Sequence, residues 1–248
     1  GSQRRGFATF LLVTLGVFGL TFVGSIMGTA GGMFAAYTYY ASGLPDPHIL
    51  DDDRLAPAES TYVYDRTGET LLARFECQNR EAVVFDELPE RVWQATVASE
   101  DRTFWENNGV DIQATIRAAV RNLQAGRIVQ GASTITQQTA RLLFLSQDRT
   151  LERKAIELVY AVERENTYTK AQILGMYMSR AYYGAGAYGY EAAAQRYFNK
   201  PAAKLSIKEA AMLAGVLKSP TNYDPIAQYD RCLERANLVL DAMAENGV

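Results

Sequence analysis

The sequence of 248 residues has a single histidine and only two cysteines. The histidine, His48, lies in an acidic stretch, so a catalytic triad that uses histidine and a histidine-rich metal site are both excluded. Cys77 and Cys232 lie far apart in the chain, which excludes a disulfide scaffold and the ligand spacing of a cysteine metal site. They can pair only if the fold brings them together, and we expect unpaired, buried thiols.

The sequence also lacks a large excess of basic or acidic residues, and it lacks the nucleotide-binding motifs. The chain has 25 basic and 28 acidic residues, so its overall charge gives no reason to expect a nucleic-acid partner. No stretch matches the GxxxxGK[ST] phosphate-binding loop, and the glycine-rich residues 183–189 do not follow a predicted strand with dinucleotide-binding spacing. There we expect tight helix packing around small residues.

Charged residues are missing altogether from residues 6–45, and residues 7–27 are almost continuously apolar. About 20 such residues are needed to cross the hydrocarbon core of a bilayer as a helix, so residues 1–42 are predicted to hold a tail and one transmembrane helix. A cleaved signal peptide is the alternative, although its apolar region is usually about 7 to 15 residues long. Arg4 and Arg5 precede the run, which places the amino terminus in the cytoplasm and the rest of the chain outside.

Residues 43–88 are predicted to form a linker and a small β region. Proline and aspartate are frequent at its start. Residues 61–65 and 69–75 then flank an Arg-Thr-Gly turn, a pattern typical of a short β-hairpin. Residues 82–85 are a candidate third strand.

From residue 89 onward the pattern becomes helical, and residues 89–248 are predicted to form one helical domain. Ser206 and Glu209 have the spacing of a capping box, which marks a helix start. Apolar residues recur three and four positions apart. The expected helices cover residues 92–99, 112–123, 151–162, 170–178, 189–197, 206–216 and 230–246.

The helix expected from residue 151 has two distinct faces. Its apolar stripe includes Leu158 and Val162, and the opposite face gathers Arg153, Glu157 and Tyr160. One interpretation of the polar face is a solvated surface. The other is that this face lines a cleft.

Two glutamates and a pair of cations could carry chemistry. Glu100 and Glu157 are separated by a run of hydroxyl and amide side chains at residues 131–138, and Arg153 and Lys154 stand beside the second glutamate. One carboxylate can take a proton from an attacking hydroxyl, while arginine or lysine stabilises a departing phosphate. The alternative is that both glutamates are solvated helix charges.

With these residues the chain resembles the glycosyltransferase domain of bacterial peptidoglycan polymerases, the family of class A penicillin-binding proteins and monofunctional glycan polymerases. The resemblance covers residues 60–248 and rests on five segments in the family's order. They are EDRTF at residues 100–104 with GVD at 109–111, GASTITQQ at 131–138, RKxxE at 153–157, KxxIL from residue 170 to Tyr177, and EAAxLAG at 209–215 with KSP at 218–220.

The resemblance implies a mainly α, lysozyme-like domain with a small β-hairpin region, held at the outer face of the bacterial cytoplasmic membrane by one amino-terminal helix. It further implies polymerisation of lipid II into β-1,4 glycan strands, with inversion and release of undecaprenyl pyrophosphate. The implied partners are lipid II, the lipid-linked glycan strand, phosphoglycolipid inhibitors, the membrane and other cell-wall synthesis proteins.

The resemblance also assigns roles to residues. Glu100 corresponds to the base that deprotonates the acceptor 4-hydroxyl, and Arg153 and Lys154 to the pyrophosphate-binding pair. Glu157 corresponds to a second catalytic glutamate that orients cations or binds a divalent ion such as Mg²⁺ or Mn²⁺; no other cofactor is expected. The other residues implied in substrate binding are Asp101, Phe104, Ser133, Thr134, Gln137, Gln138, Arg141 and Lys218.

Four positions depart from the family pattern: Asn107, Arg141, Gly175 and Ser179, the last of which replaces an amide. Asn107 stands where the family usually has histidine; it can donate a hydrogen bond but cannot carry charge. Arg141 stands where lysine is frequent, and Gly175 replaces an acid in a segment that we interpret as architectural. Glycine inside a helix costs about 1 kcal/mol against alanine, so another factor must favour it.

Two other functions stay open. A lysozyme-like lytic hydrolase would use Glu100 as an acid, but it has no pyrophosphate to bind with Arg153 and Lys154. An inactive scaffold that binds lipid II or glycan is suggested by Asn107 and Gly175. The glycosyltransferase hypothesis predicts that Glu100 faces the two cations across a common groove.

Overall fold

The computed structural model divides into two compact units, Gly1–Leu44 and Pro45–Val248. Within the described part of the chain, no helix is both long and apolar enough to cross a membrane. The spanning segment predicted at residues 7–27 lies outside the described residues, apart from Ser25, and the domain boundaries predicted at residues 43 and 89 stay predictions. The structure describes residues 25, 28, 31, 32, 34–42, 61–75, 79, 80, 85, 88–127, 129, 131–144 and 151–248.

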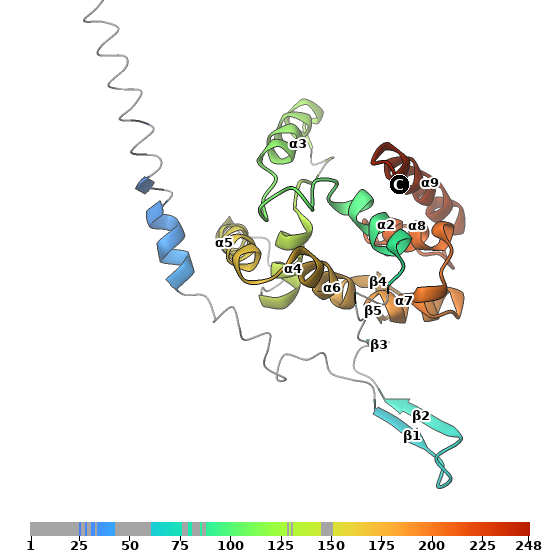
Figure 1. The fold of residues 1–248 in the computed structure, drawn as a ribbon. Coiled ribbons are helices and arrows are strands. Elements are labelled where there is room, and N and C mark those ends of the chain that lie inside the picture. The colour runs from blue at the N-terminus through green and yellow to red at the C-terminus, as the bar shows by residue number, and fades with distance from the viewer. Residues whose placement is uncertain are drawn as a thin grey trace, which may run out of the picture. The chain divides into compact units, whose positions relative to one another are not determined.

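A two-stranded hairpin opens the described part of the second unit. Strands β1 (Thr61–Tyr64) and β2 (Leu71–Phe75) pair antiparallel, with Thr61 opposite Phe75 (Figure 1). The carboxylate of Asp65 closes the turn by accepting hydrogen bonds from the backbone and the hydroxyl of Thr67. The predicted hairpin is confirmed.

The structure is mainly helical, as predicted. Ser206 caps α8, since its hydroxyl accepts from the backbone N–H of Glu209 at 3.3 Å while the Glu209 carboxylate accepts from the Ser206 N–H at 2.8 Å. This confirms the capping box. The helices are α2 (Glu90–Glu100), α3 (Ile112–Ala125), α4 (Ile135–Phe144), α5 (Leu151–Thr167), α6 (Lys170–Arg180), α7 (Tyr190–Phe198), η4 (Ala202–Lys204, a 3-10 turn), α8 (Ile207–Val216) and α9 (Tyr229–Glu245).

Helix α8 lies at the centre of the core. Every side chain from Ala210 to Val216 is buried, and α2 and α9 pack against it (Figure 1). Gly215 permits the close approach of α9, because a Cβ there would lie 2.9 Å from Cγ of Arg235. The packing fixes the carboxyl end of α2 beside α9.

The buried thiol of Cys232 belongs to this core and is free, whereas Cys77 lies outside the described residues.

The small sheet was not predicted where it occurs. Strands β4 (Tyr182–Gly184) and β5 (Ala187–Tyr188) form an antiparallel pair, and β3 (Asn79–Arg80) runs parallel to β5. Glycines with positive φ bend residues 182–188 back into this hairpin. The tight packing expected around small residues is present, because a Cβ on Gly184 would lie 2.9 Å from the Tyr197 hydroxyl oxygen on α7. Of the third strand expected at residues 82–85, only Phe85 is described, and it is not in a strand.

Gly189 ends this hairpin and offers a test of the packing. It has a φ of +88°, and a Cβ there would lie 2.7 Å from the backbone oxygen of Ser179, which cannot move aside easily. We expect Gly189→Ala to lower the free energy of unfolding by about 3 kcal/mol or more, measured by urea denaturation. Gly186→Ala is the control, since its φ is +79° but nothing lies within 4 Å; we expect a loss of about 1 kcal/mol. Equal losses would contradict the steric argument.

Helix α4 was not predicted as a helix, and its first six residues are buried apart from the half-buried Gln138. Four of these six are threonine or glutamine, so this half of the helix lacks the apolar periodicity of a core helix. The polar groups are nevertheless bonded: Thr139 Oγ1 donates to the Ile135 carbonyl oxygen at 2.8 Å, and Thr136 Oγ1 donates to Glu165 on α5 at 2.6 Å. Bonded in this way, polar side chains can be enclosed at small cost.

Helix α5 therefore turns a polar face toward α4. The fully enclosed side chains are Glu157, Ala161 and Arg164, at helical spacing, whereas Leu158 and Val162 of the predicted apolar stripe are only half-buried. The solvated-surface interpretation of the polar face is thus wrong, because α4 covers that face with polar partners of its own.

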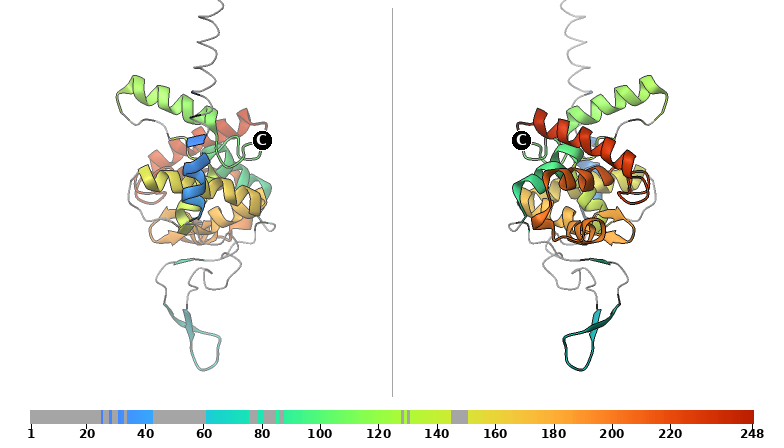
Figure 2. Two further views of the ribbon diagram at one scale, coloured as in Figure 1. Left: turned by 90° about the vertical axis from the view of Figure 1, so that its left-hand side faces the viewer. Right: turned by 90° about the vertical axis from the view of Figure 1, so that its right-hand side faces the viewer.

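Helix α3 forms as expected but leaves its apolar residues uncovered. It projects from the packed helices (Figure 2), and Ala118 is its one fully buried residue in the described structure. The large apolar side chains that it exposes are Ile112, Ile116, Val120 and Leu123.

Candidate active site

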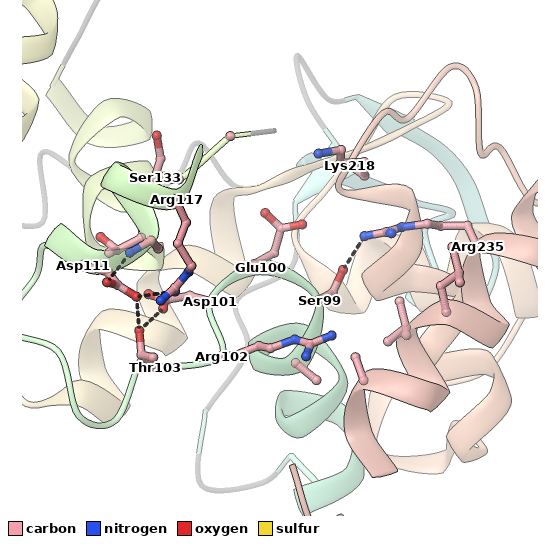
Figure 3. A pocket seen from close by; sticks show the side chains of 18 residues that line it. Ser99, Glu100, Asp101, Arg102, Thr103, Asp111, Arg117, Ser133, Lys218 and Arg235 are labelled. Atoms are coloured by element: carbon pink, nitrogen blue, oxygen red, sulfur yellow. Dashed lines mark hydrogen bonds and ion pairs between the residues drawn. The ribbon is translucent and has the colours of Figure 1, made fainter. Parts of the chain in front are cut away.

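Glu100 is the last residue of α2, and its side chain points into a cavity of about 300 Å³ (Figure 3). Lys218, which follows α8, and Arg235 on α9 line the same cavity on one side of Glu100, and Ser133 lies on the other. Within the described chain, neither cation forms an ion pair with a carboxylate. Their positive charge is therefore available to an anion in the cavity.

The environment of Glu100 makes it a stronger base than an ordinary glutamate. Burial raises the pKa of its carboxyl group, while a hydrogen bond from Gln138 and the charges of Lys218 and Arg235 act in the opposite direction. The neighbouring Asp101 carboxylate raises the pKa further. Gln138 Nε2 donates to Glu100 Oε2 at 3.0 Å. A raised pKa improves proton acceptance as long as the carboxylate stays ionised.

Asp101 was predicted to bind substrate, but its oxygens are engaged within the protein. The residue is 7% exposed, and its carboxylate accepts from the Ile135 backbone N–H and from Asn107 Nδ2, each at 3.1 Å. Thr103 Oγ1 donates to it at 3.3 Å. Asp101 thereby fixes the start of α4 to the end of α2. Its role is to hold these two parts of the site in place.

Asn107 donates to the Asp101 carboxylate from its side-chain amide. The positive charge beside it comes from Lys170, whose Nζ donates to the Asn107 carbonyl oxygen at 2.6 Å and pairs with Glu165 at 2.7 Å. The ammonium also lies 4.7 Å from the ring centroid of Phe104, a cation–π arrangement. Phe104 is fully buried, so the prediction that it contacts substrate is corrected: the ring belongs to the core.

The hydroxyl and amide run forms the start of α4. Thr134 Oγ1 donates to the Gly109 carbonyl oxygen at 2.6 Å and accepts from the Gln137 backbone N–H at 3.1 Å, so Thr134 caps the helix. The Thr134 hydroxyl thus both donates and accepts a hydrogen bond within the protein. Thr134 is 2% exposed yet lines the cavity of Glu100, where it shapes the wall.

Glu157 lies at the centre of a cation cluster. Its side chain is 1% exposed, and three cations approach it: Lys154 Nζ at 2.5 Å, Arg153 Nη1 at 3.1 Å and Arg141 Nε at 3.4 Å. Arg141 and Lys154 are each 40% exposed and can reach a ligand. This is the geometry of a phosphate-binding site.

Ser133 connects this cluster to the cavity of Glu100. Lys154 Nζ donates to Ser133 Oγ at 3.1 Å and to Gln137 Oε1 at 3.3 Å. These three residues line a second cavity, of about 500 Å³, whose other walls are mostly apolar residues, the majority of them on α3. The expected common groove is thus two cavities in this structure, with Ala132 and Ser133 in the walls of both.

The structure supplies the reason that favours Gly175. A Cβ at this position of α6 would lie 3.3 Å from Cβ of Phe85, closer than most such contacts. Glycine lets Phe85 approach α6, and this close contact offsets the poor helix propensity of glycine.

Sequence reasoning missed Arg235 and Tyr177. Arg235 Nη2 donates to Ser99 Oγ at 3.3 Å, next to Glu100 (Figure 3). It comes from α9, where no motif distinguishes it from surface arginines. Tyr177 stands in the segment interpreted as architectural, yet its hydroxyl reaches Gln138 at 3.3 Å. The packing of α6 on α4 brings these two residues together, and no sequence pattern indicates it.

Comparison with known proteins identifies the family of the chain. A transglycosylase family model matches residues 68–244. Penicillin-binding protein 1A of Aquifex aeolicus is 48% identical over 204 residues, covering 82% of this chain and 28% of the relative. Penicillin-binding protein 1A of Escherichia coli is 41% identical over 219 residues, covering 88% of this chain and 25% of the relative. The chain thus spans little more than a quarter of the length of these relatives.

A crystal structure of penicillin-binding protein 1A from Haemophilus influenzae aligns with a TM-score of 0.42 at 21% identity, covering 77% of this chain and 19% of that one; this score is too low to assign the fold. The family model alone covers well over half of the sequence. The chain belongs to the transglycosylase family, as a glycosyltransferase domain of the class A penicillin-binding protein type.

Proposed function

We propose that the chain polymerises lipid II into β-1,4 glycan strands, with inversion at the reacting sugar carbon and release of undecaprenyl pyrophosphate. The observation that carries this proposal is the placement of Glu100. This base candidate lies between two groups of cations, with Lys218 and Arg235 in its own cavity and the Glu157 cluster reached through Ser133.

In the proposed reaction, ionised Glu100 takes the proton from the acceptor 4-hydroxyl. The oxygen of that hydroxyl forms the new bond to the sugar carbon as the bond from this carbon to the pyrophosphate oxygen breaks. The electron pair of the broken bond leaves with the pyrophosphate. Burial raises the pKa of Glu100, which favours proton transfer to it, and cations nearby offset the developing negative charge.

The cation cluster around Glu157 is suited to the leaving pyrophosphate. Arginine forks bind phosphate oxygens in pairs, and lysine acts as a mobile point charge. Glu157 engages all three cations through its two oxygens, so it holds their side chains in one place before substrate arrives. A preordered set of charges costs less reorganisation during the reaction.

A divalent ion near the pyrophosphate stays a prediction. Both oxygens of Glu157 accept bonds from cations, so the groups around it do not fit a directly bound metal ion. The described residues also contain no group of three or more histidine, cysteine, aspartate or glutamate side chains placed to hold a metal.

We further propose that the domain works at the outer face of the cytoplasmic membrane, anchored by residues 7–27 with the amino terminus inside. The apolar side of α3 lies beside the cavity of Lys154, and an exposed apolar surface next to a phosphate site fits a substrate with a lipid tail. The lipid-linked strand, lipid II, phosphoglycolipid inhibitors and other cell-wall synthesis proteins are the proposed partners.

Incubation with labelled lipid II in detergent tests the function. Glycan polymer would support it. Shortening of preformed glycan without polymer formation would instead identify a lytic hydrolase, and binding without turnover would identify an inactive scaffold.

Lys154→Ala tests the phosphate site. We expect the affinity for a phosphoglycolipid inhibitor to fall about 10- to 100-fold, because a charge-assisted hydrogen bond to phosphate is lost. Isothermal titration calorimetry would measure the change. Lys208→Ala, at an exposed position on α8, is the matched control and should bind normally. Unchanged affinity in Lys154→Ala would remove this lysine from the site.

A further inference from the structure

Three helices contribute to a chain of hydrogen bonds that ends on Glu100. Tyr177 of α6 donates from its hydroxyl to Gln138 Oε1 at 3.3 Å. Gln138 of α4 donates from Nε2 to Glu100 Oε2 at 3.0 Å. Glu100 is the last residue of α2. Tyr177 is 3% exposed and does not line the cavity, so it reaches Glu100 only through the amide.

The chemistry of the three groups sets the direction of this chain. An ionised carboxylate only accepts hydrogen bonds, so Gln138 must present its NH₂ end to Glu100. Its carbonyl end then faces α6 and needs a donor. Burial raises the pKa of the Tyr177 hydroxyl far above its ordinary value, so this hydroxyl stays protonated and able to donate. If the amide turned over, its oxygen would face the carboxylate oxygen and repel it.

We propose that Tyr177 is a positioning residue for the reaction: it fixes the amide of Gln138 so that this amide holds the Glu100 carboxylate ionised and aimed into the cavity. The inference rests on the proposed function of Glu100 as base. No proton passes along these hydrogen bonds from Tyr177 to Glu100. The proton from the acceptor hydroxyl goes to Glu100, while Tyr177 and Gln138 keep theirs.

The other ionisable groups around Glu100 come from different elements. Lys218 after α8 and Arg235 on α9 favour its charged form, whereas the adjacent Asp101 disfavours it. Tyr183 of β4 is buried nearby, and its pKa is raised mainly by burial, with a contribution from Glu100. In the described structure, the two cations make no hydrogen bond to Glu100, so the Gln138 amide gives this carboxylate its direction.

Tyr177→Phe removes the hydroxyl and keeps the ring. We expect kcat/KM for lipid II polymerisation to fall about 10-fold, because the released Gln138 amide no longer holds its hydrogen bond to the charged Glu100 carboxylate. Because the Gln138 bond lowers the pKa of Glu100, its loss raises this pKa, so the acid limb of the pH–rate profile should move to higher pH. Tyr190→Phe is the matched control: Tyr190 is equally buried, its hydroxyl has no hydrogen-bond partner among the described residues, and its variant should keep the wild-type profile.

A double-mutant cycle separates positioning from packing. In a Gln138→Met background, Tyr177→Phe should cause no further loss, since the hydroxyl has nothing left to fix. An equal loss in both backgrounds, or a wild-type pH profile in Tyr177→Phe, would overturn the proposal. The carboxyl ¹³C shift of Glu100, titrated in wild type and Tyr177→Phe, gives a readout that needs no turnover. An upward shift of the Glu100 pKa in Tyr177→Phe supports the positioning role of Tyr177 even if the protein polymerises nothing. In that case only the proposed function fails.

Discussion

Glu100→Gln is expected to reduce lipid II polymerisation by about 10²- to 10⁴-fold, the usual contribution of a positioned general base. The substitution keeps the size of the side chain, and the new amide can still accept from Gln138 Nε2 through its oxygen. What it cannot do is take the proton of the acceptor hydroxyl. Turnover of labelled lipid II should therefore fall while binding of a phosphoglycolipid inhibitor stays close to normal.

The pH dependence of the wild-type enzyme gives the same prediction a second test. Burial raises the pKa of Glu100 in the folded protein, and the base must be ionised to act. Activity should thus rise with pH through a value above that of an ordinary glutamate. Glu100→Gln should lose this acid limb along with the activity. Its thermal stability should equal or exceed that of wild type, because a raised folded pKa means that the buried charge costs stability at neutral pH.

The control for this experiment is Glu106→Gln. Glu106 is exposed six residues further along the chain and should retain wild-type turnover. Near-normal polymerisation in Glu100→Gln would show that another group accepts the proton. Loss of inhibitor binding in step with activity would show instead that the substitution damaged the site as a whole.

Much of the helical framework could be predicted from the sequence, because α8 and α9 carry apolar residues at helical spacing and Ser206 carries a capping signal. The hairpin of β1 and β2 followed from its Arg-Thr-Gly turn. Helix α4 could not be predicted in this way. Its buried residues include Thr136, Gln137 and Thr139, a composition typical of a polar loop, and only the structure shows partners such as Glu165 for Thr136.

The candidate site could be predicted in part for the same reason. Motifs identify Glu100, Glu157 and the cations beside it, since these residue types at these spacings carry the chemistry. They do not show which side chains face the ligand and which hold the others in place. Asp101 and Phe104 belong to the second group, and only their burial shows it. Arg235 was beyond sequence reasoning, because a contact with Ser99 across 136 positions leaves no local pattern.

Glu157→Gln is expected to have the second large effect, on both stability and turnover. The substitution removes a negative charge that pairs with three cations, and the Glu157 side chain that carries it is 1% exposed. Breaking a fully buried ion pair costs about 3 to 5 kcal/mol. Here Lys154 and Arg141 are each 40% exposed and can regain water, so we expect about 2 kcal/mol less free energy of unfolding. Urea denaturation would measure it.

Turnover should fall further than this loss of stability explains, by about 100-fold, because the three cations lose the group that holds them in one geometry. Inhibitor affinity should change much less, since the charge that attracts phosphate is still present and less compensated. Glu152→Gln, exposed on the first turn of α5, is the matched control and should be neutral in both assays. If Glu157→Gln instead lost inhibitor binding and turnover equally while keeping its stability, Glu157 would contact the ligand directly rather than order the cations around it.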